Sequence, residues 1–130
     1  MKTIYISLVF CILLSTCENE NSDSIIGHWS NLEADNDTIT LIRVDHLEGS
    51  EYGFSFEEGG IFTERKNAGW CGTPPITYAN FDGTWLQTDS LVEITVGYWG
   101  GQVEYRWIIL SVDKKKLTYY RENEVLIPDL

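Results

Sequence analysis

The 130-residue chain is poor in basic residues, cysteine and proline. Nine Lys and Arg against twenty Asp and Glu give a formal charge of −11 at pH 7, and so acidic a chain repels the phosphate backbone of nucleic acids. Three Pro and eleven Gly exclude collagen-like and low-complexity sequences. Five Trp, seven Tyr and five Phe are present instead, which indicates one folded unit with an aromatic-rich core.

Long hydrophobic runs are also missing, although the N-terminus is apolar. After Lys2, a mainly apolar run extends from Ile4 through Leu14, as in the basic start and hydrophobic core of a secretory signal peptide. A membrane-spanning helix needs about 20 mainly apolar residues, so this run is too short to span a bilayer. We therefore expect residues 1–16 to be a signal peptide.

The end of this leader resembles a bacterial lipobox. In that motif, here Leu14, Ser15, Thr16 and Cys17, the cysteine thiol is acylated and becomes the first residue of the mature protein. The resemblance implies an outer-membrane lipoprotein of the cell envelope, exposed to the periplasm or at the cell surface. The alternative is an ordinary secretory leader with an incidental cysteine.

Residues 17–24 then comprise the lipidated cysteine and a tether. The tether contains no apolar residue, so we expect it to be flexible and negatively charged. Acidic residues directly after a lipobox cysteine also resemble the surface-export signal of lipoproteins in the Bacteroidetes group. Cys71 is the only other cysteine of the mature chain, and an intramolecular disulfide with it is therefore not expected once Cys17 is acylated.

Beyond the tether, short runs of alternating apolar and polar residues are separated by turn-forming residues. Val92, Ile94 and Val96, for example, fall on one face of a strand, and the residues between them fall on the other. This pattern predicts an all-β domain without helices. The eight expected strands are residues 25–31, 38–44, 51–56, 61–66, 80–87, 91–98, 102–112 and 116–121.

Short turns between these strands predict an antiparallel up-and-down meander. An open meander would expose two long edges to aggregation, and closure into a small eight-stranded barrel removes both. A β-sandwich of the same strands is the alternative. A barrel of eight strands is wide enough to be filled by its own side chains or to hold one small ligand.

The first expected strand resembles a lipocalin opening. Gly27, His28 and Trp29 match the Gly-x-Trp motif of lipocalins, and more closely that of the lipocalin-like domains of bacterial lipoproteins. The resemblance implies a lipocalin-like barrel over residues 25–130 that binds a small hydrophobic molecule or a lipid. It also implies that Gly27 turns the chain into the base of the barrel, that Trp29 plugs this end, and that Arg121 from the last strand stacks on Trp29.

Four aromatic residues are candidates for contact with a ligand. Trp70 lies in a loop with two Gly, two Pro and Cys71, which we interpret either as a lid over the barrel mouth or as a connection that packs into the core. Tyr98, Tyr105 and Trp107 fall on the inward face of their expected strands.

No catalytic motif and no cofactor site are evident. Cys71 has no histidine within twenty residues, and His28 and His46, the only histidines, lack a nearby third ligand for a metal. Glu57 and Glu58 fall in an expected turn without an apolar pocket to support acid catalysis. The sequence therefore predicts a protein that is not an enzyme.

Three function classes remain open at this point. A ligand carrier requires a void among the inward aromatic residues. A protein-binding or inhibitor module requires a filled barrel and recognition through loop residues such as Trp70 and Trp99. A metal-handling lipoprotein requires histidine and cysteine side chains that converge. The volume inside the barrel distinguishes the first two.

Overall fold

The structure is a computed structural model that describes residues 24–69 and 76–129. The expected signal peptide, the lipidation site Cys17, most of the tether, Trp70 and Cys71 lie outside the described residues. The described part contains eight strands and no helix, which confirms the all-β prediction. The strands are β1 (Gly27–Asp35), β2 (Thr38–Val44), β3 (Gly53–Glu57), β4 (Ile61–Asn67), β5 (Tyr78–Thr88), β6 (Leu91–Tyr98), β7 (Gly101–Val112) and β8 (Lys116–Pro128).

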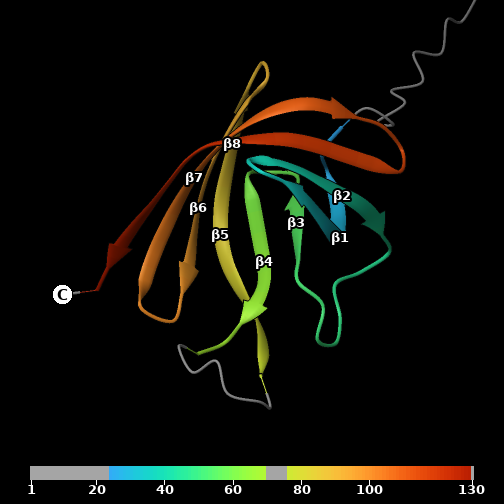
Figure 1. Ribbon diagram of the computed structural model, residues 1–130. Coiled ribbons are helices and arrows are strands. Elements are labelled where there is room, and N and C mark those ends of the chain that lie inside the picture. Colours follow the sequence, from blue (N-terminus) through green and yellow to red (C-terminus); the bar gives the residue numbers. More distant parts are fainter. Residues whose placement is uncertain (1–23, 70–75, 130) are drawn as a thin grey trace, which may run out of the picture.

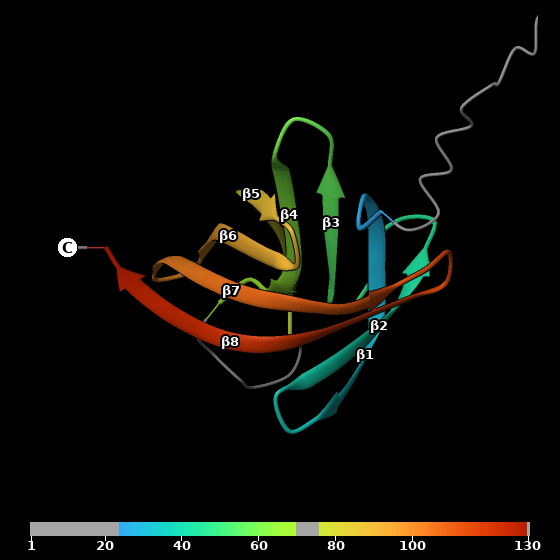
Figure 2. The same ribbon diagram turned by 90° about the horizontal axis from the view of Figure 1, so that it is seen from above.

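The strands form a closed antiparallel barrel, as predicted, and not a β-sandwich (Figure 1). From β3 to β8, consecutive strands are neighbours and form a meander. At the closure, β1 pairs with β2 on one edge and with β3 on the other, and β2 completes the ring by pairing with β8. The connection between β2 and β3 therefore passes across β1, and Figure 2 shows the ring from above.

The connection between β2 and β3 packs closely against β1 and β3. Leu47 of the connection lies against Gly53 at the start of β3, where an added Cβ would be 2.7 Å from the Leu47 side chain and 2.6 Å from the Trp29 carbonyl oxygen. Only glycine fits at this position, because both the connection and β1 approach the backbone there. The outer side of β1 and β3 is thus partly covered by the chain itself.

Aromatic side chains fill most of the barrel interior. Alternate residues of each strand point inward, and this alternation produces one continuous core. Its largest members are Trp29, Phe54, Phe56, Phe62, Trp107 and Tyr119. The Trp107 ring stacks on Tyr119 with centroids 3.9 Å apart and meets the edge of Phe54 at 4.9 Å. Each such ring removes about 150–250 Å² of surface from water, so these side chains dominate the stability of the barrel.

Trp29 plugs the end of the barrel at which β1 begins. The indole is fully buried, and its Nε1 donates a hydrogen bond to the Ile25 carbonyl at 2.8 Å. The Arg43 guanidinium lies 4.2 Å from the centroid of the Trp29 ring. Gly27 has φ of +139°, and a Cβ there would clash with this guanidinium, so glycine is required.

The arginine that stacks on Trp29 is therefore Arg43 of β2, and the expectation that Arg121 would do so was wrong. The reason is the strand order: Arg43 is the direct cross-strand partner of Trp29 because β2, not β8, lies beside β1. Arg121 lies farther along the wall, where its Nη2 is 3.7 Å from Asp37 and donates to the Asn36 carbonyl at 3.3 Å.

The last strand is longer than the sequence pattern predicted. β8 continues to Pro128, and its residues beyond 121 pair with β7 alone. A register shift in this pairing falls at Glu122, between the Trp107–Arg121 and Arg106–Asn123 pairs. The barrel wall therefore has a gap beside the second half of β8, because this part of the strand has a neighbour on one side only.

Candidate binding site

The carboxylate of Glu64 is buried in the barrel interior. Glu64 follows Phe62 by two positions on β4, so both side chains point inward. Its side chain is 0% exposed. A buried carboxylate is strongly destabilising unless other groups pair with it and donate hydrogen bonds to it.

Three side chains from three parts of the fold satisfy this carboxylate. The Tyr105 hydroxyl from β7 donates to both oxygens, at 2.9 and 3.0 Å. The Tyr52 hydroxyl, next to the start of β3, donates to Oε2 at 2.5 Å. The Lys66 ammonium, with a side chain 15% exposed, lies 2.5 Å from Oε1. Lys66 neutralises the charge of Glu64, and the tyrosines supply the remaining hydrogen bonds.

The tyrosines of this cluster remain protonated donors. Burial is the main cause that raises the pKa of Tyr52 and of Tyr105 above the ordinary value, and the adjacent Glu64 carboxylate raises both further. Burial also raises the pKa of Tyr119. The interior therefore presents neutral hydroxyls around a single compensated carboxylate.

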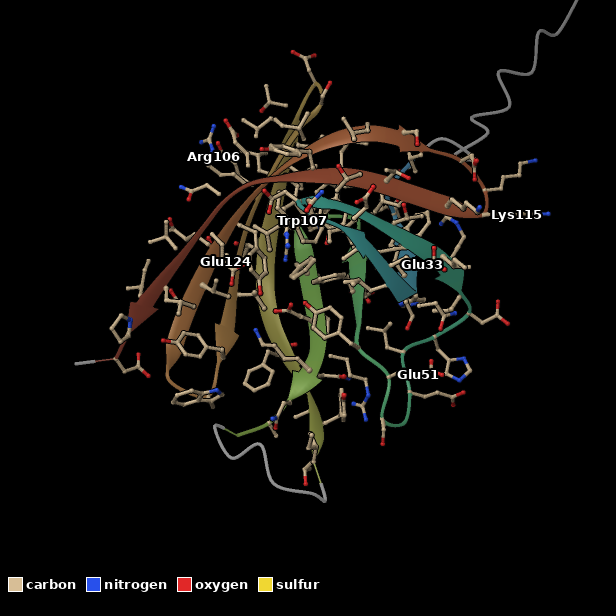
Figure 3. All side chains as sticks on the ribbon, in the orientation of Figure 1. Glu33, Glu51, Arg106, Trp107, Lys115 and Glu124 are labelled. Atoms are coloured by element: carbon tan, nitrogen blue, oxygen red, sulfur yellow. The ribbon has the colours of Figure 1, made fainter. Side chains whose placement is uncertain are left out.

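A cavity of about 210 Å³ lies beside this cluster. It meets the exterior between β8 and the strands β1 and β3, where the wall is interrupted. The lining residues are Leu32, Tyr52, Phe54, Tyr105, Trp107, Tyr119, Arg121 and Glu124. Figure 3 labels Trp107 in the interior and Glu124 on β8.

The walls of this cavity are mainly aromatic, and its rim is charged. Trp107 is stacked between Tyr119 and Tyr105, whose centroid is 5.7 Å from the Trp107 centroid at an interplanar angle of 23°. Arg121 and Glu124 contribute one positive and one negative group from the same strand. Such a lining suits a flat apolar molecule with a polar substituent near the rim.

The cavity includes two of the four sequence candidates for ligand contact, Tyr105 and Trp107. Tyr98 is not among its lining residues and instead meets the edge of the Trp99 ring, with centroids 5.6 Å apart. Trp70 lies outside the described residues.

Tyr52 and Glu64 were not predicted as site residues from the sequence. One signal was available for Glu64, because strand alternation places it on the same face as Phe62. An acidic residue at an inward position of a strand is unusual enough to mark a site.

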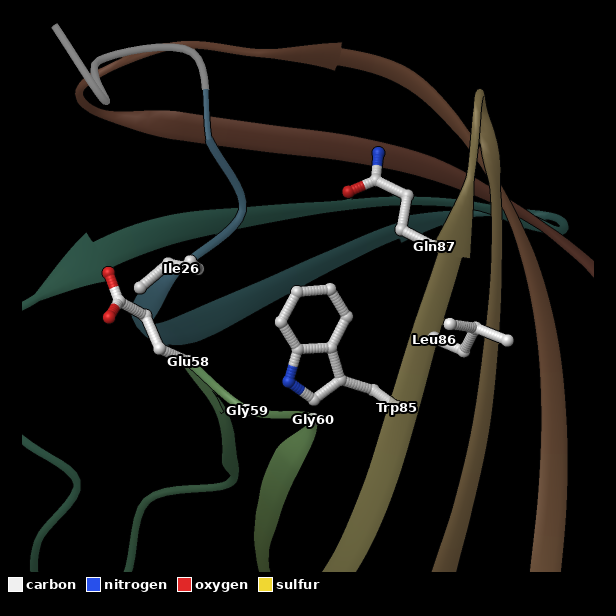
Figure 4. Close-up of a pocket in the computed structure, with 7 residues that line it drawn as sticks. All are labelled: Ile26, Glu58, Gly59, Gly60, Trp85, Leu86 and Gln87. Atoms are coloured by element: carbon white, nitrogen blue, oxygen red, sulfur yellow. The ribbon is translucent and has the colours of Figure 1, made fainter. Parts of the chain in front are cut away.

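A larger hollow, of about 560 Å³, lies beside the turn between β3 and β4 (Figure 4). It is formed between Ile26, the turn at residues 58–60 and the β5 residues Trp85, Leu86 and Gln87. The Trp85 indole is fixed there by a 2.9 Å hydrogen bond to the Glu57 carbonyl. Glu58 is the one ionisable side chain in this lining, so few polar groups converge on a ligand. The interior cavity is the better candidate because its polar groups come from several strands.

Within residues 24–69 and 76–129, no three His, Cys, Asp or Glu side chains are grouped so that they could hold a metal ion. The same residues include no helix of the length and apolar character needed to cross a membrane. Comparisons with protein families, with curated proteins and with solved structures gave no match to this chain.

Proposed function

We propose that the protein is a membrane-anchored, lipocalin-like lipoprotein of the cell envelope that binds a small hydrophobic molecule in its barrel without catalysis. The observation that carries the proposal is the aromatic-lined cavity beside the buried Glu64 cluster. Convergent polar groups in a mainly apolar pocket are the usual features of a small-molecule site.

The size of the cavity narrows the ligand class. An apolar cavity of about 150 Å³ accommodates benzene, whereas pockets for drug-sized ligands span about 300–1,000 Å³. A cavity of about 210 Å³ therefore suits a single aromatic ring with a small substituent. The packed core of Phe54, Phe56, Phe62 and Trp107 occupies the space that a long acyl chain would need.

The Glu64 cluster has a positioning role in this proposal. Its hydrogen bonds fix the rings of Tyr52 and Tyr105 as cavity walls before any ligand arrives. Such preorganisation lowers the entropic cost of binding. Arg121 and Glu124 at the rim are available to a polar substituent on the ligand.

The membrane anchor depends on the lipobox resemblance at Cys17. The chain enters the described domain at Ser24, whose carbonyl accepts a 3.0 Å hydrogen bond from Arg43 at the plugged end. Mass spectrometry of the protein from its own host should find an acylated Cys17 as the first residue. A different first residue without a fatty acid would refute the anchor.

One observation favours the alternative, a protein-binding or inhibitor module. The core is largely filled, and the Trp99 side chain at the turn between β6 and β7 is 56% exposed. Exposed aromatic residues on loops are frequent anchors of protein interfaces. Under this alternative, Trp99 contributes to the recognition of a partner protein.

The decisive experiment is a binding titration of the mature protein. Calorimetry with toluene, phenol and benzoate should detect one-to-one binding of at least one ring compound, and laurate should not bind. Leu32→Trp, which places a larger side chain in the cavity lining, should weaken ring binding at least tenfold. Leu110→Trp, at an exposed position outside this lining, is the matched control.

Failure of every ring compound to bind would refute the ligand-carrier proposal. Unchanged binding by Leu32→Trp would also refute it, because the ligand would then lie elsewhere. A stable complex with a host protein that is lost in Trp99→Ala would establish the alternative instead.

A further inference from the structure

A row of polar side chains crosses the outer face of the barrel. His28 on β1 is the direct partner of Ser55 on β3, and Ser55 is the direct partner of Thr63 on β4. Because their sequence neighbours Trp29, Phe54 and Phe62 point inward, these three side chains point outward. Direct cross-strand neighbours have Cβ atoms about 4.5–5.5 Å apart, so the three polar groups are close together.

Two atoms of this row lack hydrogen-bond partners. The Ser55 residue is only 3% exposed, and its Oγ has no partner among the described residues. The buried Nδ1 of His28 has none within the same part of the chain. Buried polar atoms are nearly always hydrogen-bonded in native proteins, and two neighbouring exceptions point to a partner other than the described residues.

The residues that carry these atoms, His28 and Ser55, line a hollow of about 210 Å³ on the outside of the wall. The crossing connection between β2 and β3 contributes His46 and Leu47 to it. The strands contribute the remaining residues, which are His28, Ser55, Glu57, Thr63 and Asn80. The hollow is distinct from the interior cavity, because it lies on the opposite face of β3 and β4.

The lining chemistry selects among ligand classes. Two hydroxyls, two imidazoles and one amide can both donate and accept hydrogen bonds, and Glu57 can only accept. Glu57 and the −11 charge of the chain disfavour an anion. A metal ion is disfavoured because the described residues provide no group of three suitable ligands.

We propose that this hollow binds one neutral polyhydroxylated molecule, such as a sugar ring or a cyclic polyol. A pair of adjacent hydroxyls both donates and accepts, and so satisfies Ser55 Oγ and His28 Nδ1 together. Asn80 and Glu57 face further hydroxyls, and Leu47 supplies an apolar contact for the C–H face of the ring. The volume is sufficient for a single ring.

The test uses the mature protein and defined probes. Saturation-transfer NMR should detect at least one compound among glucose, galactose, mannose, N-acetylglucosamine and myo-inositol. Ser55→Ala should weaken its binding at least tenfold. The fold should remain intact in this variant, because the Ser55 hydroxyl has no partner among the described residues to lose.

Two further variants complete the design. Asn80→Ala changes an exposed residue whose Oδ1 accepts a surface hydrogen bond from Arg65, so the barrel should stay folded, and binding should weaken severalfold. Thr95→Ala removes a hydroxyl that faces outward on β6, away from the hollow, and should leave binding unchanged.

Three results would overturn this inference. They are an absence of binding by all five probes at millimolar concentration, equal binding by wild type and Ser55→Ala, and a response of His28 to Zn²⁺ alone. Each result leaves the proposed function intact, because toluene and phenol are tested against the interior cavity. Conversely, a sugar that binds in the presence of saturating ring compound supports two separate sites.

Discussion

Two charged side chains of this barrel, Arg43 and Glu64, each accept or donate several hydrogen bonds, and their surroundings differ. Arg43, at the plugged end, donates mainly to backbone carbonyls, those of Ser24 at 3.0 Å, Ile26 at 2.7 Å and Lys114 at 3.0 Å. Glu64, in the interior, is satisfied by the side chains of Tyr52, Lys66 and Tyr105.

This difference indicates a purely structural role for Arg43 and a role beside a binding site for Glu64. Backbone carbonyls are fixed by the strands and turns, so Arg43 ties three chain segments together and closes one end of the barrel. The donors to Glu64 are instead side chains, and two of them, Tyr52 and Tyr105, form walls of a cavity. We therefore expect changes at Arg43 to affect stability alone, and changes around Glu64 to affect stability and binding together.

The largest effect is expected for Glu64→Ala. The substitution leaves Lys66 as a partly buried, unpaired charge and two tyrosine hydroxyls without their acceptor, and it should lower the free energy of unfolding by about 3–5 kcal/mol. Urea unfolding measures this change. Glu93→Gln, at an exposed ion pair with Arg106, is the control and should cost less than about 1 kcal/mol. Equal effects of the two substitutions would show that the interior cluster contributes no special stability.

Arg43→Ala should be next, at about 2–3 kcal/mol. It removes a cation–π contact with Trp29 and charge-assisted hydrogen bonds to carbonyls that water reaches in part. Near-UV circular dichroism should report the altered surroundings of Trp29. Ring-compound affinity in the folded variant should remain within twofold of wild type, and a larger loss would contradict the division between the two regions.

The third prediction concerns alkaline pH. Because the folded-state pKa values of Tyr52 and Tyr105 are raised above the ordinary value near 10, the folded state retains protons that the unfolded chain releases. Their contribution to stability is present below about pH 10 and is lost as the pH rises beyond it. Urea midpoints between pH 8 and 11 should fall accordingly. Tyr105→Phe should flatten this dependence, and Tyr120→Phe, on an exposed side chain, should not.

Arg121→Gln should have the smallest effect on stability. Its 3.7 Å pair with Asp37 is exposed, and such pairs contribute about 0–1 kcal/mol. The near-UV signal of Trp29 should be unchanged, in contrast to Arg43→Ala. A change in that signal as large as the one in Arg43→Ala would instead support stacking of Arg121 on Trp29, which the lipocalin resemblance implied.

Much of the fold could be predicted from the sequence because strand alternation is a local property. Val92, Ile94 and Val96 are all buried on one face of β6, as their spacing indicated. The same periodicity placed Tyr105 and Trp107 inward. These predictions need no knowledge of which strands are neighbours.

Features that depend on strand neighbours could not be predicted in this way. The eight residues between β2 and β3 do not reveal that β1 lies between these strands, and this order decides that Arg43 stacks on Trp29. The Glu64 cluster likewise unites β4, β7 and the start of β3. Alternation places Glu64 on the inward face of β4, but nothing local indicates that tyrosines from other parts of the fold enclose it.

The closure of the ring also determines when the chain can fold. Thr40 of β2 and Thr118 of β8 face each other across 78 residues of sequence, so the first hairpin acquires its final neighbour only when the last strand has been made. Until that moment, β2 and β7 both have unpaired edges, which are prone to aggregate. A polypeptide that leaves the ribosome N-terminus first is therefore prone to aggregate until β8 has been made. A truncation before β8 should yield insoluble protein instead of a smaller barrel.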